Sequence, residues 1–326
     1  MRTAAHKATR FAFRRMPDIV KPYPNNRRRG MQEQEQYFRP PAEEESFIIR
    51  VMHGCSHNRC TFCNMYKGIP LDVFPLDEVL RGIDRDAAEL GGAYAPLVTS
   101  LYLDGGDPLC LATGHLLAVI GRARARFPNL RRVACYATAR SINRKNEAEL
   151  AELAVAGLAC VYVGLESGLD AILAATCKGA TRADMLRSAD LARAAGIDFD
   201  VSIMLGMGGP ELSNLHADST ASLLCAIRPV CVRIRTLVPN TETPLGDDYL
   251  AGRFTLMDPY AVLREQRRMV ERITAPMRLL SEHWSNFIRF DAALPGDRDA
   301  LLALLDEALE RPREAFRETG ICAERH

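Results

Sequence analysis

The sequence lacks long apolar runs, a secretory signal and any large excess of one charge. No apolar run reaches the ~18 residues that a membrane-spanning helix needs, and the N-terminus does not resemble a signal peptide. The formal net charge at pH 7 is only +1, and tryptophan occurs once, at Trp284. We therefore expect a protein without a membrane segment, located in the reducing cytoplasm.

Cysteine occurs ten times, but without the paired spacing of a disulfide framework. Seven of the cysteines stand singly in apolar segments, as small buried hydrophobic residues do. The other three, Cys55, Cys60 and Cys63, lie within nine residues. Thiolates grouped so closely favour a metal centre, and without a fourth cysteine in the loop one metal position stays open for chemistry. A closed structural zinc site, with His53 or His57 as the fourth ligand, is the alternative.

Charge is unevenly distributed along the chain. Residues 1–40 carry ten Lys or Arg against three acidic residues, so the remainder of the chain is acidic. The same segment contains several prolines and little apolar periodicity, which predicts a flexible basic leader over residues 1–45. A solvated tail is the plain interpretation of this leader. An RNA-contacting arm and an organelle transit peptide are the alternatives.

From residue 46 onward, short apolar segments alternate with segments whose apolar residues recur at helical spacing. Strand-like segments lie at 47–52, 98–103, 132–136, 159–163, 199–205 and 230–237. Helical segments lie at 76–90, ending at a Gly-Gly pair, and at 116–127, 147–156, 182–195 and 213–227. Strands joined through helices form a parallel sheet by right-handed crossovers. Six such units predict an α/β protein, either a partial (β/α)6 TIM-like barrel or an open doubly wound sheet.

The chain beyond residue 245 is expected to be an α-rich C-terminal extension, residues 246–326, that covers a core formed by residues 46–245. Helices are predicted at 260–273 and 301–309, with a last strand at 277–280. The following loop gathers three polar or aromatic side chains, His283, Trp284 and Asn286. This loop either closes over a substrate or holds a packed tryptophan beside a satisfied histidine.

The cysteine loop follows the first predicted strand, so it is expected at the C-terminal face of the sheet, where ligands bind in such folds. Other unusual loops follow other strands. Gly105 and Gly106 precede Asp107 after the second strand. Glu166 lies between glycines after the fourth strand, and Gly206 begins a glycine-rich turn after the fifth. Because glycine lets the backbone approach a ligand closely, these loops together predict a binding site at one face.

Two arginines mark the sixth predicted strand. Arg233 and Arg235 lie two residues apart, so their side chains share one face of the sheet. On an inward face, guanidinium groups are suited to hold a carboxylate or phosphate of a cofactor or substrate bidentately. The alternation with apolar residues equally fits an outward polar face.

Taken together, these loops resemble those of the radical S-adenosylmethionine (SAM) superfamily. The family signature is three cysteines after the first strand of a partial (β/α)6 barrel, with an aromatic residue before the last cysteine. Phe62 stands at that place here, and Tyr66 lies in the continuation of the loop. The resemblance covers residues 46–245. The spacing is Cys-x4-Cys-x2-Cys, one residue longer than usual, which leaves the subfamily undetermined.

The resemblance also implies roles for the other loops. Gly105, Gly106 and Asp107 resemble the Gly-Gly-Glu motif that takes the SAM amino group, with Asp107 one methylene shorter than the usual glutamate. Glu166 is similar to a glutamate that contacts SAM in the oxygen-independent coproporphyrinogen oxidase and methylthiotransferase branches. The stretch around Gly206 resembles the segment that lines the adenine pocket.

The resemblance implies a [4Fe–4S] cluster held by the three cysteines, with SAM on the fourth iron. It further implies cleavage of SAM to methionine and a 5′-deoxyadenosyl radical that takes a hydrogen atom from an unidentified small or medium substrate, in an oxidation or a transfer. An external one-electron donor such as flavodoxin or ferredoxin is implied as a partner.

Two alternatives to this enzyme remain from the sequence. One is a non-catalytic haem or cofactor chaperone that keeps the cluster and the SAM site, with His53, His57 and His283 as candidate haem ligands. The other is an RNA-modifying enzyme, suggested only by the basic leader.

Overall fold

The computed structural model describes residues 37–323, which belong to one compact unit beginning at Tyr37. The basic leader predicted for residues 1–45 therefore lies mostly outside the described residues. Its last part is described: a short 3-10 helix, η1 (Pro41–Glu43), packs in this unit with Glu43 fully buried. None of the described helices is long and apolar enough to cross a bilayer.

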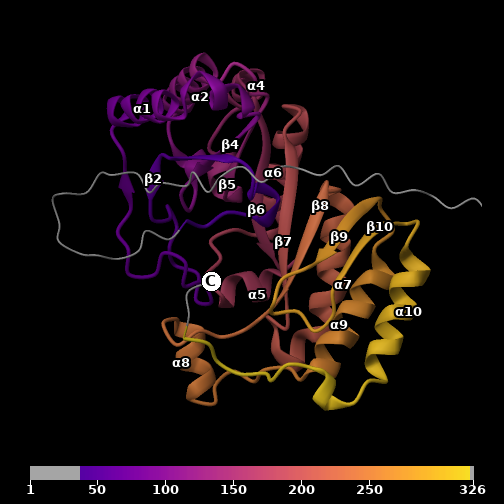
Figure 1. Cartoon of the computed structure of the whole chain (residues 1–326). Helices are drawn as coiled ribbons and strands as arrows, with labels where there is room; N and C mark the ends of the chain where they lie inside the picture. The colour runs from indigo at the N-terminus through magenta and orange to yellow at the C-terminus, as the bar shows by residue number, and fades with distance from the viewer. Residues whose placement is uncertain (1–36, 324–326) are drawn as a thin grey trace, which may run out of the picture. The chain divides into compact units, whose positions relative to one another are not determined.

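An eight-stranded, mostly parallel sheet forms the centre of the unit (Figure 1). Its strands, in spatial order, are β1 (Phe47–Arg50), β4 (Ser100–Asp104), β5 (Arg132–Ala137), β6 (Leu158–Glu166), β7 (Asp198–Leu205), β8 (Cys231–Thr236), β9 (Met277–Ser281) and β10 (Phe290–Leu294). Every neighbouring pair is parallel except β9 and β10. Two short strands, β2 (Met52–His53) and β3 (Asp72–Val73), form a separate antiparallel ladder.

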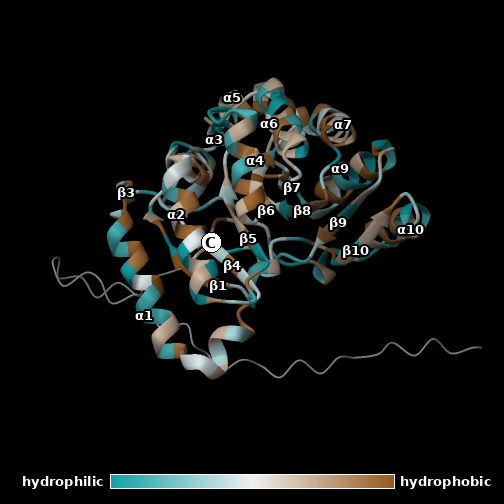
Figure 2. Ribbon diagram, turned by 90° about the horizontal axis from the view of Figure 1, so that it is seen from above, coloured by the Kyte–Doolittle hydropathy of each residue, from teal (hydrophilic) through white to brown (hydrophobic). Residues whose placement is uncertain are grey.

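Helices follow most strands of the sheet and cover its outer face (Figure 2). The helices are α1 (Leu76–Tyr94), α2 (Thr113–Arg126), α3 (Ala139–Asn143), α4 (Glu147–Ala156), α5 (Asp170–Ala175), α6 (Arg182–Ala194), α7 (Gly209–Ile227), α8 (Pro244–Leu250), α9 (Pro259–Arg272) and α10 (Arg298–Leu309). Local sequence sets several of their ends. In α4, Asn146 and Glu149 form a reciprocal capping box, and Gly157 ends the helix in the left-handed region with φ 118°.

The prediction of a partial (β/α)6 barrel is confirmed. The six predicted strands are β1 and β4–β8, and the predicted last strand is β9. The regular helix is interrupted at Gly91 (φ 68°), where its end was predicted, and a short helical piece continues α1 to Tyr94. Strand β10 and the short helices α3, α5 and α8 were not predicted.

The two faces of the sheet differ in chemistry because neighbouring side chains alternate between them. Outward side chains such as Leu101 and Leu103 pack with the helices in the main apolar core. Inward side chains form a small aromatic cluster that includes Tyr102, Tyr136 and Tyr162. The inner face of the described sheet therefore carries phenol hydroxyl groups, which its outer apolar face lacks.

Candidate functional site

The three clustered cysteines line one cavity at the C-terminal ends of the parallel strands. Cys55, Cys60 and Cys63 share a cavity of about 220 Å³. The loop that carries them is stabilised by hydrogen bonds of its own, because Asn58 donates to the Tyr66 carbonyl at 2.8 Å and Lys67 donates to the Cys60 carbonyl at 3.0 Å. All three cysteines therefore line one cavity, and their predicted role as cluster ligands stays a prediction.

The thiols lie close enough to influence one another electrostatically. Burial raises the pKa of the Cys60 thiol to about 11; the Lys178 ammonium opposes this shift, whereas Cys63 and Cys55 add to it. Within residues 37–323, no three His, Cys, Asp or Glu side chains are gathered as a preformed metal site. Three thiol donors on one cavity nevertheless fit a [4Fe–4S] cluster, which takes cysteine thiolates as its protein ligands.

Glycine is required where the loop after β4 meets the cysteine loop. Gly106 donates from its backbone N–H to the Gly54 carbonyl at 2.9 Å. A Cβ atom at Gly106 would lie 2.7 Å from the Cβ of Cys55 and 2.8 Å from its Cα. Gly105 precedes it with φ 146°, a conformation that favours glycine. The Gly-Gly pair therefore lets the β4 loop pack directly against the first cysteine, and Gly106 lines the cavity.

Replacing Gly106 with alanine is expected to displace Cys55 and weaken cluster binding, because the added methyl group overlaps backbone and Cβ atoms. We expect reduced iron content after anaerobic reconstitution and a SAM-dependent rate ~10- to 100-fold lower. Gly114→Ala in α2 is the matched control, since nothing lies within 4 Å of a Cβ there. Equal iron loading in both variants would contradict this packing argument.

Asp107 does not line the cavity, although it follows the Gly-Gly pair. Its buried carboxylate accepts hydrogen bonds from Ser56 Oγ at 2.5 Å, Thr138 N at 3.1 Å and Ser141 Oγ at 2.7 Å. Burial raises the pKa of Asp107, and these donors oppose that shift. In this structure Asp107 therefore joins the cysteine loop to α3, and its predicted contact with the SAM amino group stays a prediction.

Glu166 and Lys178 form a polar pair beside the cysteines. Glu166 has φ 63° at an irregularity between β6 and β7, and its Oε1 lies 3.0 Å from Lys178 Nζ. Both residues line the cavity, as does Phe62, whose ring centre is 5.9 Å from Lys178 Nζ. Burial disfavours the charge of Lys178, but Glu166 and Cys60 raise the pKa of this ammonium above its usual value. The pair thus keeps a cation next to the thiols.

The structure separates the two arginines of β8. Arg235 lines the cavity and donates a hydrogen bond to the phenol of Tyr136. Arg233 lies outside the lining and forms an ion pair with Asp200, with two hydrogen bonds of 3.2 Å. Both side chains point to the inner face of the sheet, one of the two orientations that the sequence left open. They do not bind one anion together, because Asp200 already neutralises Arg233.

Gly206 also lies outside the cavity lining. Its φ is 79°, and its N–H donates to the buried Glu265 carboxylate of α9 at 2.7 Å. Two residues of the preceding strand, Ser202 and Met204, line the cavity instead. Helix α9 thus holds the loop after β7 in place. The two residues are 59 positions apart, so no local sequence pattern predicts this contact.

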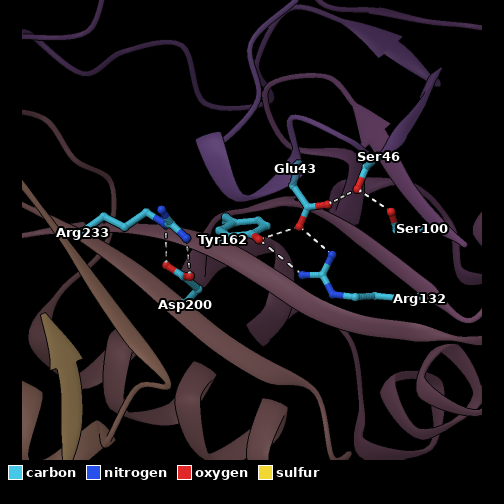
Figure 3. Close-up of polar contacts among 7 residues, drawn as sticks. All are labelled: Glu43, Ser46, Ser100, Arg132, Tyr162, Asp200 and Arg233. Carbon is cyan, nitrogen blue, oxygen red and sulfur yellow. Dashed lines mark hydrogen bonds and ion pairs between the residues drawn. The ribbon is translucent and has the colours of Figure 1, made fainter. Parts of the chain in front are cut away.

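A polar network joins the segment before β1 to β5 and β6 (Figure 3). Glu43 Oε1 accepts hydrogen bonds from Tyr162 Oη at 2.5 Å and Arg132 Nη1 at 2.6 Å, and Glu43 Oε2 accepts one from Ser46 Oγ at 2.5 Å. Tyr162 lines the cavity, and the Arg233 guanidinium lies 5.6 Å from its ring centre. The segment before β1 therefore fixes a cavity-lining aromatic ring. No sequence signal pointed to this network.

The loop after β9 contributes to the cavity wall. His283 and Trp284 line the cavity, and Trp284 is 42% exposed. Asn286 lies elsewhere: it donates to the Ile234 carbonyl at 2.7 Å and so links this loop to β8. Of the histidines near the cysteines, His57 lines the cavity and contacts the Cys177 carbonyl at 2.7 Å, whereas His53 does not line it.

The sequence model of the radical SAM superfamily matches residues 49–224, more than half of the chain. No curated protein matches the chain. Among solved structures, the chain is similar to the radical S-adenosylmethionine methyltransferase TsrM from Kitasatospora setae, with cobalamin and a [4Fe-4S] cluster bound: 21% identity, TM-score 0.51, 82% of this chain and 53% of that one. It is also similar to coproporphyrinogen III oxidase (HemN) from Escherichia coli, with 15% identity, TM-score 0.53, 86% of this chain and 62% of that one.

The chain therefore belongs to the radical SAM superfamily of enzymes, whose members use a [4Fe–4S] cluster and SAM. At these low identities the solved structures show a shared fold. The chain spans less than two thirds of the length of either of these two proteins.

Proposed function

We propose that Cys55, Cys60 and Cys63 hold a [4Fe–4S] cluster and that the chain uses it to cleave SAM reductively. The observation that carries this proposal is that all three cysteines line one cavity at the C-terminal end of the sheet. When bound, such a cluster supplies the electron that splits SAM into methionine and a 5′-deoxyadenosyl radical, which takes a hydrogen atom from substrate.

The residues around the thiols would bind different parts of SAM in this proposal. Gly106 brings the β4 loop within contact of Cys55 and leaves its backbone near the cavity for a SAM polar group. Glu166 offers a carboxylate for hydroxyl or amino groups of SAM, and Lys178 holds that carboxylate in place at 3.0 Å. Phe62 and Tyr66 supply apolar surface beside the thiols.

Shielding from water is the second contribution of the chain. A carbon-centred radical must be kept from solvent and from unintended donors, so the cavity has to be enclosed during the reaction. The sheet supplies the rings of Tyr136 and Tyr162 at its inner face, and the loop after β9 adds Trp284. The electron reaches the cluster from outside the chain, and we propose a flavodoxin- or ferredoxin-type donor for this step.

Product analysis tests the proposal. The full chain is reconstituted anaerobically with iron and sulfide and incubated with SAM and dithionite. We expect 5′-deoxyadenosine and methionine to form. Methylthioadenosine as the main product would mean that a different carbon–sulfur bond is cleaved. Absence of any SAM-derived product from a fully loaded cluster would contradict the enzymatic proposal and favour a cofactor carrier.

A further inference from the structure

The charged residues that line the cavity are unequal in sign. Three cationic side chains, Arg140, Lys178 and Arg235, face one carboxylate, Glu166. Lys178 pairs with Glu166 at 3.0 Å, so these two charges offset each other. In residues 37–323 no carboxylate lies within ion-pair distance of Arg235. The cavity therefore keeps positive charge that no carboxylate of the described residues neutralises.

Arg233, two residues earlier on the same face of β8, is an inward arginine that has an acidic partner. Arg233 has Asp200 as a partner, at 3.2 Å through both of its hydrogen bonds. Arg235 has instead the phenol of Tyr136, and burial raises the pKa of Tyr136 so that it stays neutral at ordinary pH. A half-buried guanidinium without a counter-ion is costly, and an anion in the cavity removes that cost.

Arg235 and the cysteines belong to different elements of the cavity wall. The thiols follow β2 and adjoin Phe62 and Lys178, whereas Arg235 lies one residue before the end of β8. The loop after β9 meets that end of β8, because Thr236 N donates to Ser285 Oγ at 3.1 Å. This loop brings His283 and Trp284 to the cavity, with their ring centres 5.5 Å apart. With the cluster and SAM assigned to the thiols, the β8–β9 end is the part of the wall left for a second molecule.

The β8–β9 end is held in place by the C-terminal segment. Arg317 Nε donates to the Ser285 carbonyl at 2.9 Å, and its guanidinium lies 4.6 Å from the ring centre of Phe287 and 5.9 Å from that of Trp284. His283 Nδ1 lies 2.8 Å from Ser285 Oγ. The loop that carries Trp284 is thus held against the end of β8 at Ser285, as expected of a binding surface.

We propose that the β8–β9 end of the cavity binds an oxyanion of the substrate, a carboxylate or a phosphate, with Arg235 as its counter-ion and Trp284 against its apolar body. This inference rests on the proposed function, because it assigns SAM to the cysteine end. Guanidinium groups suit both anions through paired N–H donors. The substrate class that follows is a planar or apolar molecule with one anionic group.

The single tryptophan makes this end of the cavity directly observable. The full chain with its reconstituted cluster is titrated with benzoate, with inorganic phosphate and with benzamide, the neutral counterpart of benzoate, while Trp284 fluorescence is followed. Binding of radiolabelled SAM is measured on the same preparations by equilibrium dialysis. The titrations are repeated with Arg235→Gln, Arg235→Lys and the surface control Arg264→Gln, after circular dichroism has confirmed the fold of each variant.

We expect benzoate or phosphate to change the fluorescence saturably and benzamide to have no such effect. Arg235→Gln should weaken anion binding at least about tenfold, Arg235→Lys should restore part of it, and Arg264→Gln should leave it unchanged. SAM affinity should stay within about threefold of wild type in all variants.

Three results would overturn the proposal. Loss of SAM binding in Arg235→Gln would show that this arginine holds the carboxylate of SAM. Equal responses to benzoate and benzamide would show that charge is not recognised. No saturable response to either anion up to about 10 mM would show that the cavity has no anion site. Because none of these readouts needs SAM cleavage, absence of 5′-deoxyadenosine would overturn the proposed function separately.

Discussion

Replacing Cys60 with alanine should remove the iron–sulfur cluster and with it the cleavage of SAM. Cys60 is the middle thiol of the three that line the cavity, and no other cysteine of residues 37–323 lines it. Removing a residue that only hydrogen-bonds a metal ligand lowers metal affinity or activity ~10- to 100-fold. Removing a ligand itself should therefore lower cluster binding by a larger factor. Iron and acid-labile sulfide content and the rate of 5′-deoxyadenosine formation are the measurements.

The matched control is Cys225→Ser in α7. Cys225 is half-buried, lies away from the cavity lining and accepts a hydrogen bond from Thr274 N at 3.2 Å, which serine can also accept. We expect this variant to retain its iron and its rate. Full cluster content in Cys60→Ala would contradict the assignment of the three ligands, whereas iron loss in both variants would point to general damage by the procedure.

Removing Asp104 should destabilise the fold strongly. Its carboxylate lies 2.6 Å from Arg50 Nε, in an ion pair whose side chains are only 2% and 6% exposed. The pair joins the ends of β1 and β4, directly before the Gly-Gly pair of the site. Breaking a buried ion pair from one side leaves an uncompensated charge and costs about 3–5 kcal/mol. Urea unfolding of Asp104→Ala should show this loss in the free energy of unfolding.

Two comparisons make the Asp104 prediction specific. Asp77→Ala removes an exposed pair with Arg81 on α1, and such surface pairs contribute little to stability. The double variant Arg50→Met/Asp104→Leu removes both charges and should recover much of the stability lost in Asp104→Ala. A double variant less stable than Asp104→Ala would contradict the view that burying the Arg50 charge without Asp104 causes the loss.

The alternation of strands and helices was predictable because each element carries its own local signal. Helix α4 is the clearest case, since Asn146 and Glu149 cap its start and Gly157 ends it. Strand β10 lacked such a signal: it has five residues and an aspartate, and it is stabilised by antiparallel pairing with β9 rather than by its own pattern. The kink at Gly91 has a local signal as well, because glycine readily adopts its φ of 68°.

The candidate site was predictable only where its residues are close in sequence. The three cysteines, which are close in sequence, line one cavity, and Gly106 and Glu166 also line it. The sequence predicted Asp107 at the site because it follows a strand, and Arg233 because it lies within one. Their hydrogen-bond partners, however, lie far along the chain. Ser141 lies 34 residues beyond Asp107, and Asp200 lies 33 residues before Arg233. Long-range partners of this kind leave no local pattern.

Electron paramagnetic resonance of the reduced, reconstituted protein tests the central claim most directly. If the three cysteines leave one iron open and SAM binds there, dithionite should produce a [4Fe–4S]⁺ signal whose g values shift when SAM is added. Cys55→Ala, Cys60→Ala and Cys63→Ala should each lose this SAM-responsive signal. A signal that SAM leaves unchanged, or a protein that takes up zinc and shows no iron–sulfur signal, would contradict the account.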